Sequence, residues 1–435
     1  MNRFRILAIF GISALIGHGS IAQDLESKPA DPFFEKFTPI RAPVYTNLLL
    51  RTGDRLAIIG DSITQQKQYS CNIETYLTVC VPELKVSVRQ FGWNGETAAG
   101  FLLRMTNDCL RFKPTIATLC YGMNDHAYGP YDEKRAQWYR QSYTTVARVL
   151  KDAGARVVLG SPGCVGRVPA WSAYTNVPVE ELNLNLCQLR NIDIDIAAQE
   201  KIRFADVFWP MFTVGHSAQK KFGPDFAIAG KDGVHPDAAG HLVMTYAFLK
   251  ALGLDGNIGT FTVDLAANTA RVSNGHTLNA FTNGTLTITS TRYPFCASGP
   301  TDKDDSTRAG MNLVPFNDEL NRLVLVVKNG KADKYAVTWG GEKRIYSNAQ
   351  LAAGVNLAED FEVNPFTDAF DKVDNAVFLK QTYETTQIKE MFHTPAAQAD
   401  PDGVAETTEK GREPFVDAIV RQFVPVTHTI KIEAL

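Results

Sequence analysis

Short apolar runs alternate with amphipathic stretches between residues 50 and 254, and this alternation restricts the fold more than any other feature. The apolar runs cover residues 55–60, 85–91, 115–121, 155–160 and 202–208. The spacing predicts helices near 65–80, 97–111, 132–153, 178–200 and 236–252, the last with Pro236 in its first turn. Apolar strands separated by helices indicate a parallel sheet that is covered on both faces. We therefore expect a flavodoxin-like three-layer α/β/α domain with a parallel five-stranded sheet.

The sequence changes character after Gly253. Residues 258–294 alternate apolar and polar side chains around Asn-Gly turns at 274–275 and 283–284, a pattern typical of an antiparallel hairpin or meander. Further strands are expected at 323–330 and 334–339, joined by a turn, and at 427–432. Residues 357–393 read as helical with a break near Pro365, and 297–310 and 394–413 read as loops. We expect an α/β domain over 23–254 and a smaller C-terminal β-rich accessory domain with a helical insertion over 255–435.

The N-terminus has the pattern of a secretory signal over residues 1–22. Arg3 and Arg5 precede an apolar core at 6–17, and Ser20-Ile21-Ala22 resembles a cleavage site. The apolar core is too short to span a bilayer, and no later run is long enough, so no integral membrane segment is expected after cleavage. We therefore expect an exported protein, periplasmic or extracellular. The net charge of −3 and the lack of a basic stripe argue against nucleic acid as a partner. The oligomeric state stays open.

Seven cysteines follow the signal region, at positions 71, 80, 109, 120, 164, 187 and 296. Because an exported protein can oxidise its thiols, we expect one or two disulfides without assigning the pairs. Cys120 lies within an apolar run and is expected to be a buried strand thiol. No CxxC or Cys/His cluster has the spacing of a metal site, so no metal is expected.

Four short polar motifs each follow an expected strand or precede the last helix. They are Gly60-Asp61-Ser62, the 92–97 segment with Gly95, the 122–125 segment with Asn124, and the 232–236 segment with Asp232 and His235. The carboxyl ends of parallel strands meet at one edge of a sheet, where ligands bind in such folds. We therefore expect the four motifs to form one site.

Ser62, His235 and Asp232 are the residue types that nucleophilic catalysis requires. A serine hydroxyl needs a base to take its proton, and an imidazole titrates near neutral pH. Asp232, three residues before His235, can accept a hydrogen bond from the ring and orient it. Each motif alone has a simpler interpretation: Ser62 or Asp61 as a helix cap, Gly95 in an ordinary turn, Asn124 as a cap and His235 as a loop histidine. These simpler interpretations would all have to hold independently at one edge of the sheet, so we prefer the interpretation as one catalytic site.

The four motifs resemble the conserved blocks of the SGNH (GDSL-type) esterase and lipase superfamily, over about residues 50–254. The resemblance implies Ser62 as nucleophile, Asp232 and His235 as its partners, and the backbone N–H groups of Ser62 and Gly95 with the side-chain amide of Asn124 as oxyanion donors. It implies a serine carboxylic ester hydrolase without metal or organic cofactor. The expected substrates are short-chain esters, acetyl esters above all, on a polysaccharide or small molecule. The alternatives are a lysophospholipase or thioesterase, or a non-catalytic glycan-binding protein.

Other aromatic and histidine residues are weaker candidates. Trp93, Tyr121 and Tyr128 adjoin the motifs and either shape a substrate pocket or pack in the core. His216 is a minor candidate for lining the cleft, and His126 and His241 flank the motifs. In the distal region a sugar-stacking platform is a minor alternative to core packing, because aromatics on strands are usually core residues; its members would be Tyr335, Trp339 and Tyr346.

Overall fold

Five parallel strands form the central sheet of the computed structural model, which describes residues 24–435. The predicted signal segment at 1–22 lies outside the described residues. The strand order is β2-β1-β3-β4-β5, which confirms the predicted flavodoxin-like topology. Nearly every residue of these strands is buried, as expected for a sheet covered on both faces. The strands are β1 (Arg55–Gly60), β2 (Ser87–Gly92), β3 (Ile116–Cys120), β4 (Arg156–Gly160) and β5 (Arg203–Ala205).

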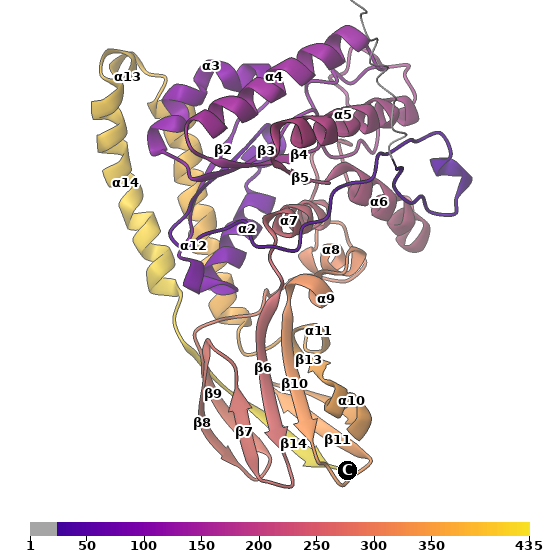
Figure 1. Ribbon diagram of the computed structural model, residues 1–435, viewed down its shortest axis with the longest axis vertical. Coiled ribbons are helices and arrows are strands. Elements are labelled where there is room, and N and C mark those ends of the chain that lie inside the picture. The colour runs from indigo at the N-terminus through magenta and orange to yellow at the C-terminus, as the bar shows by residue number, and fades with distance from the viewer. Residues whose placement is uncertain (1–23) are drawn as a thin grey trace, which may run out of the picture.

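Helices cover both faces of this sheet (Figure 1). One layer contains α3 (Ala98–Asp108), α4 (Glu133–Asp152) and α5 (Val179–Glu200). The other contains α2 (Gln68–Val79) and α7 (Ala238–Leu252), with the short α1 (Ser62–Gln65) directly after β1. Two predictions are wrong in detail. Pro236 precedes α7 instead of lying in its first turn, and α6 (Phe208–Phe222) begins where the fifth apolar run was expected to continue as a strand.

The segment after residue 255 forms two further sheets that face one another. The first sheet has the order β13-β10-β6-β7 and the second β12-β11-β14-β9-β8. The predicted strands at 323–330 and 334–339 exist, but they lie in different sheets and do not form a hairpin. The strands are β6 (Asn257–Asp264), β7 (Thr269–Val272), β8 (His276–Thr282), β9 (Thr285–Ser290), β10 (Arg322–Lys328), β11 (Lys334–Trp339), β12 (Glu342–Ser347), β13 (Val355–Asn356) and β14 (Val426–Ala434).

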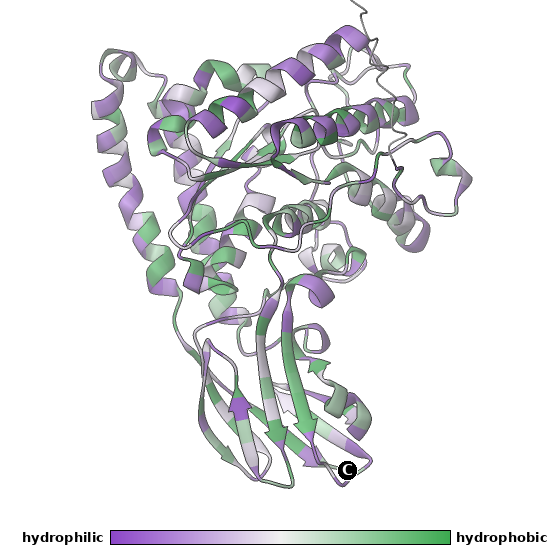
Figure 2. Ribbon diagram, viewed as in Figure 1, coloured by the Kyte–Doolittle hydropathy of each residue, from purple (hydrophilic) through white to green (hydrophobic). Residues whose placement is uncertain are grey.

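A helical arm returns from the second half of the chain to the side of the α/β unit (Figure 1). It comprises α12 (Thr367–Thr386), the π-helical turn η4 (Gln387–Met391), α13 (Pro395–Ala399) and α14 (Pro401–Gln422). The helical prediction for 357–393 is confirmed, but the predicted loop at 394–413 is wrong. Proline suits the first turns of α13 and α14, and α14 also contains Pro414. Apolar and polar residues alternate along α14 (Figure 2), as in a helix with one packed face.

The remaining helices connect these parts. They are α8 (Thr307–Leu313), α9 (Phe316–Leu320), α10 (Asn348–Ala353) and α11 (Leu357–Asp360). Apolar side chains from α2, α7, β6, β10 and α12 belong to one continuous core, so the α/β unit and the two-sheet region pack as one body. Within residues 24–435, no helix is both long and apolar enough to cross a membrane.

The expectation of one or two disulfides is wrong. All seven cysteines are free thiols and all are buried. Burial raises the pKa of these thiols, for example to about 12 for Cys164, because a thiolate is poorly solvated in the protein interior. The cysteines therefore act as small apolar core residues, as predicted for Cys120.

Candidate active site

Ser62 lies at the carboxyl end of β1, in the first turn of α1. The carboxylate of Asp61 caps this helix by accepting a hydrogen bond from the backbone N–H of Ile63 at 2.9 Å. The hydroxyl of Ser62 has a different partner: its Oγ is 2.8 Å from Nε2 of His235. The capping interpretation therefore holds for Asp61, while Ser62 contacts the predicted base.

His235 is held from its other side by Asp232. Nδ1 of His235 is 2.6 Å from Oδ2 of Asp232, and Oδ1 of the same carboxylate accepts the backbone N–H groups of Val234 and His235, each at 2.9 Å. Partial burial raises the pKa of Asp232, but these hydrogen bonds outweigh burial and hold it below the usual value. The carboxylate therefore stays ionised, and the chain Ser62–His235–Asp232 is continuous.

The loop before α3 exposes Gly95 beside the strand ends. Gly95 has a φ of +73°, a left-handed conformation that favours glycine, and open space surrounds the position where a Cβ would lie. Asn124 joins this loop from the end of β3, because its Nδ2 donates to the carbonyl of Glu96 at 3.0 Å. The hydroxyl of Tyr128 donates to Oδ1 of Asn124 at 2.9 Å. These two bonds fix which end of the amide is the donor.

A buried ion pair supports the same loop from below. Arg104 on α3 donates from Nε to Glu96 Oε1 at 2.6 Å and from Nη2 to Glu96 Oε2 at 2.7 Å. The hydroxyl of Tyr121 donates to Glu96 Oε2 at 2.6 Å. Tyr121 is completely buried, so of its two predicted roles only packing in the core agrees with the structure. Charge-assisted, bidentate contacts of this kind fix the backbone that carries them.

Two buried carboxylates connect the motifs beneath the surface. Asp125 accepts the backbone N–H groups of Ala98, at the start of α3, and of Gly122, each at 3.0 Å. Burial raises the pKa of Asp125 and of Asp61 to about 7, and the two carboxylates and Glu96 repel one another. Asp125 thus ties the loop that carries Asn124 to the loop that carries Gly95.

The weaker histidine candidates do not face the serine. His216 stacks on Phe33 with ring centroids 4.3 Å apart and contacts Asp31 at 2.9 Å, so its prediction as a cleft residue is wrong. Burial lowers the pKa of His126 to about 4 and that of His241 to about 3, which keeps both rings neutral.

The prediction that the distal aromatic residues pack in the core is confirmed, and the minor alternative of a sugar-stacking platform is wrong. Its three aromatic residues are core residues, with exposed fractions of 4%, 0% and 7% for Tyr335, Trp339 and Tyr346. A stacking platform has to present a ring face to solvent, and these rings do not.

Trp171 is a site residue that sequence reasoning missed. It lies in the loop between β4 and α5, and its side chain is 51% exposed. Its ring centroid is 5.7 Å from the His235 ring and 5.9 Å from the Tyr128 ring, which it meets edge-on. The loop has no motif, but it follows the carboxyl end of a strand, at the edge where ligands were expected.

The assembled residues can perform acyl transfer: a hydroxyl, an imidazole and a carboxylate are connected in series beside an open glycine backbone and an oriented amide. Over residues 24–435, no group of three or more His, Cys, Asp or Glu side chains is arranged to hold a metal ion.

Comparisons with known proteins show what the part of the chain that carries this site resembles. Residues 58–243 match the model of the GDSL-like Lipase/Acylhydrolase family. An acetylxylan esterase from Geobacillus stearothermophilus is 24% identical over 223 residues, covering 47% of this chain and 96% of the relative. The solved structure of a gut microbial diltiazem-metabolizing enzyme shares the fold with a TM-score of 0.70 and 20% identity, covering 90% of this chain and 100% of that chain. Residues 58–243 therefore correspond to a GDSL-like lipase/acylhydrolase domain.

Proposed function

We propose that this protein is a serine esterase that hydrolyses carboxylic esters through an acyl-enzyme on Ser62. The observation that carries the proposal is the continuous series of contacts from Ser62 Oγ through both nitrogens of His235 to the ionised carboxylate of Asp232. The match of residues 58–243 to the GDSL-like lipase/acylhydrolase model supports the same class of reaction.

In this proposal Ser62 Oγ attacks the ester carbonyl carbon while His235 Nε2 takes the hydroxyl proton. Asp232 stabilises the resulting imidazolium. Three donors stabilise the oxyanion: the backbone N–H groups of Ser62 and Gly95 and the side-chain amide of Asn124. One hydrogen of this amide is bonded to Glu96. The other is available, because Nδ2 has no second partner among residues 24–435. The alcohol leaves with the proton from His235. Water then attacks the acyl-enzyme with His235 as base, which releases the acid and restores Ser62.

The proposed substrates are short-chain esters, acetyl esters above all, on carbohydrates. The relative from Geobacillus stearothermophilus is named an acetylxylan esterase, and the exposed ring of Trp171 beside His235 offers a flat apolar face to the alcohol part of an ester. The signal-like sequence at 1–22 supports export. The competing hypothesis is a lysophospholipase or thioesterase, which would favour longer acyl chains.

The test measures hydrolysis of p-nitrophenyl esters from acetate to decanoate by the wild type and by Ser62→Ala, with Ser217→Ala, an exposed serine on α6, as the matched control. We expect activity in the wild type and the control, loss of activity in Ser62→Ala, and a decline beyond butyrate. A rise with chain length would favour the lysophospholipase hypothesis. Equal background rates in all three proteins would contradict the esterase proposal.

A further inference from the structure

The helical arm reaches the loop that carries Gly95. Lys389, in the π-helical turn η4, donates from Nζ to Oε1 of Gln65 at 2.9 Å. The same oxygen accepts the backbone N–H of Asn94 at 2.7 Å. Gln65 is three residues after Ser62 on α1, and Asn94 directly precedes Gly95. One carbonyl oxygen therefore joins the serine helix, the glycine loop and the arm. π-helical turns are often found at functional sites.

The arm also contacts the side chain of Trp93, the first residue of the loop that carries Gly95. Lys389 Nζ lies 5.3 Å from the centre of the Trp93 ring, and Cζ of Arg104 lies 4.9 Å from it. The ring of His393 meets Trp93 edge-on with centroids 5.3 Å apart, and His393 Nε2 is 3.0 Å from Asp108 at the end of α3. Cations near an indole ring are attracted to its faces. Trp93 is thus in contact with two arm residues and one residue of the α/β unit.

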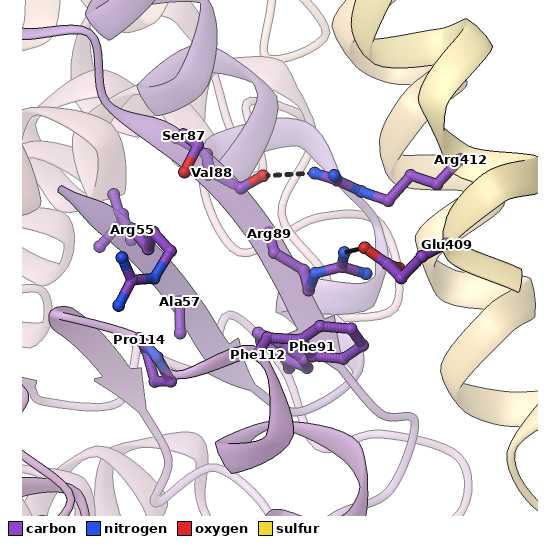
Figure 3. Close-up of a pocket in the computed structure, with 11 residues that line it drawn as sticks. Arg55, Ala57, Ser87, Val88, Arg89, Phe91, Phe112, Pro114, Glu409 and Arg412 are labelled. Carbon is purple, nitrogen blue, oxygen red and sulfur yellow. Dashed lines mark hydrogen bonds and ion pairs between the residues drawn. The ribbon is translucent and has the colours of Figure 1, made fainter. Parts of the chain in front are cut away.

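The arm is anchored along β2, the strand that leads into the loop. Arg89 on β2 donates to Gln387 at 2.7 Å and to Glu409 at 2.5 Å, and Figure 3 shows the second contact beside α14. Arg412 donates to the carbonyl of Val88 at 3.2 Å, also drawn in Figure 3. Glu384 accepts the backbone N–H of Gln90 at 3.2 Å. Arg412 and Glu384 thus bind open backbone groups of an edge strand, and Arg89 adds contacts from its side chain.

A buried ion pair adds to this anchorage. Lys380 on α12 is almost completely buried and donates to Glu74 on α2 at 2.6 Å. A buried charge that loses its partner strongly destabilises a protein, so the arm cannot detach here without a large cost. Lys389 and His393 therefore extend from a fixed base toward the loop.

We infer that Lys389 is a positioning residue for the Gly95 oxyanion donor, so that the C-terminal arm controls the catalytic rate of the α/β unit. The inference rests on the proposed function. Gly95 is exposed and has a left-handed φ, and among residues 24–435 no atom outside its chain neighbours lies within 4 Å of where its Cβ would be. The direction of its N–H therefore depends on how the neighbouring residues of the loop are held. The Lys389–Gln65–Asn94 connection restrains the residue next to Gly95 and aligns its N–H before substrate binds. A donor that is aligned in advance stabilises the transition state more than the bound ester, so the effect falls on kcat.

The experiment compares the full-length wild type with Lys389→Met, Lys389→Arg and a matched control, Lys410→Met. Lys410 is an exposed lysine of α14 that pairs with Glu406 on the same helix. Steady-state hydrolysis of p-nitrophenyl acetate gives kcat and KM, and hydrogen–deuterium exchange reports on the peptide containing Gly95. For Lys389→Met we expect kcat to fall about tenfold, because misplacing a catalytic group by about 1 Å can cost about 100-fold. KM should stay within about twofold, exchange at Gly95 should quicken, and Lys389→Arg should restore most of kcat.

A coupling measurement separates positioning from general damage. Gln65→Ala should lower kcat as Lys389→Met does, and the double variant should be no worse than either single variant, because both remove one connection. The inference is overturned if Lys389→Met keeps wild-type kcat and exchange, if its losses match those of Lys410→Met, or if the two single effects multiply. If the wild type hydrolyses no ester, the proposed function fails; unchanged exchange at Gly95 in Lys389→Met would then overturn the positioning role separately.

Discussion

At the residue scale, the amide of Asn124 has one defined orientation. Its carbonyl oxygen accepts from Tyr128 and its nitrogen donates to Glu96, so Nδ2 is the atom available to an oxyanion. Asn124→Asp keeps the shape of the side chain but removes the donor. We expect kcat to fall about 100-fold with little change in KM, since loss of one oxyanion donor costs about 3 kcal/mol in the transition state. Asn268→Asp, the same change at an exposed asparagine between β6 and β7, is the control. Equal kcat values for Asn124→Asp and the wild type would contradict the role.

Trp171 tests the alcohol side of the site. Its exposed ring contacts His235 and Tyr128 and should stack on a sugar ring. Trp171→Ala should lower kcat/KM about threefold to tenfold for acetylated xylo-oligosaccharides, because an aromatic contact contributes about 0.5–1.5 kcal/mol. Ethyl acetate, which has no ring, should be hydrolysed at the wild-type rate. Trp138→Ala removes a tryptophan of α4 that is 62% exposed and serves as the control. An equal loss for both substrates would show that Trp171 does not recognise the alcohol part.

At the scale of elements, a buried hydrogen-bond series connects the two sheets of the distal region. Trp339 Nε1 can only donate, and it donates to His428 Nδ1 at 3.1 Å. His428 Nε2 then donates to the hydroxyl of Ser290 at 3.0 Å, and this hydroxyl donates to Nδ1 of His276 at 2.8 Å. Finally, His276 Nε2 donates to the carbonyl of Ile258 at 3.1 Å. Every donor has an acceptor only when both imidazoles are neutral.

This series predicts a pH-dependent stability. Burial lowers the pKa of His428 to about 3 and also lowers that of His276, whereas both titrate near 6.5 when unfolded. The two neutral rings therefore add to the free energy of unfolding above about pH 6.5, and this stabilisation is lost as the pH falls toward about 3. Between pH 7 and pH 5, the free energy of unfolding should fall about 2 kcal/mol less in His428→Gln than in the wild type. His216→Gln is the control. Parallel pH profiles in chemical denaturation would contradict the assignment.

Sequence periodicity predicted some elements better than others. The strands of the parallel sheet were found because each is a buried apolar run, and α12 because its helical pattern is long. The helix α14 was missed because Pro401, Gly403, Gly411 and Pro414 resemble a loop in composition. Its stability comes from tertiary contacts, with α12 and with β2, a strand about 320 residues earlier in the chain. Strands β10 and β11 were joined as a hairpin because sequence neighbours usually pair, whereas here they enter different sheets.

At the scale of the whole molecule, topology explains why the site could be predicted and its surroundings could not. The carboxyl ends of β1, β2 and β3 must meet at one edge, so the sequence alone predicts that Ser62, Gly95 and Asn124 lie together. Trp171 reaches that edge from a loop that has no motif. Lys389 reaches it from an arm more than 300 residues after Ser62. No local pattern reports such contacts. The predicted disulfides failed because they were inferred from the expected compartment rather than from geometry, and all seven thiols are buried and free.

The most direct measurement of the central claim is covalent labelling of the nucleophile. An alkyl fluorophosphonate mimics an ester: a serine Oγ forms a bond to phosphorus, fluoride leaves, and the hydroxyl proton passes to the base. We expect mass spectrometry to find one phosphonyl group per chain, on Ser62, with esterase activity lost in parallel. Ser62→Ala should not be labelled, and His235→Gln should be labelled much more slowly. Labelling at another residue, or full esterase activity in protein labelled stoichiometrically at Ser62, would contradict the acyl-enzyme mechanism.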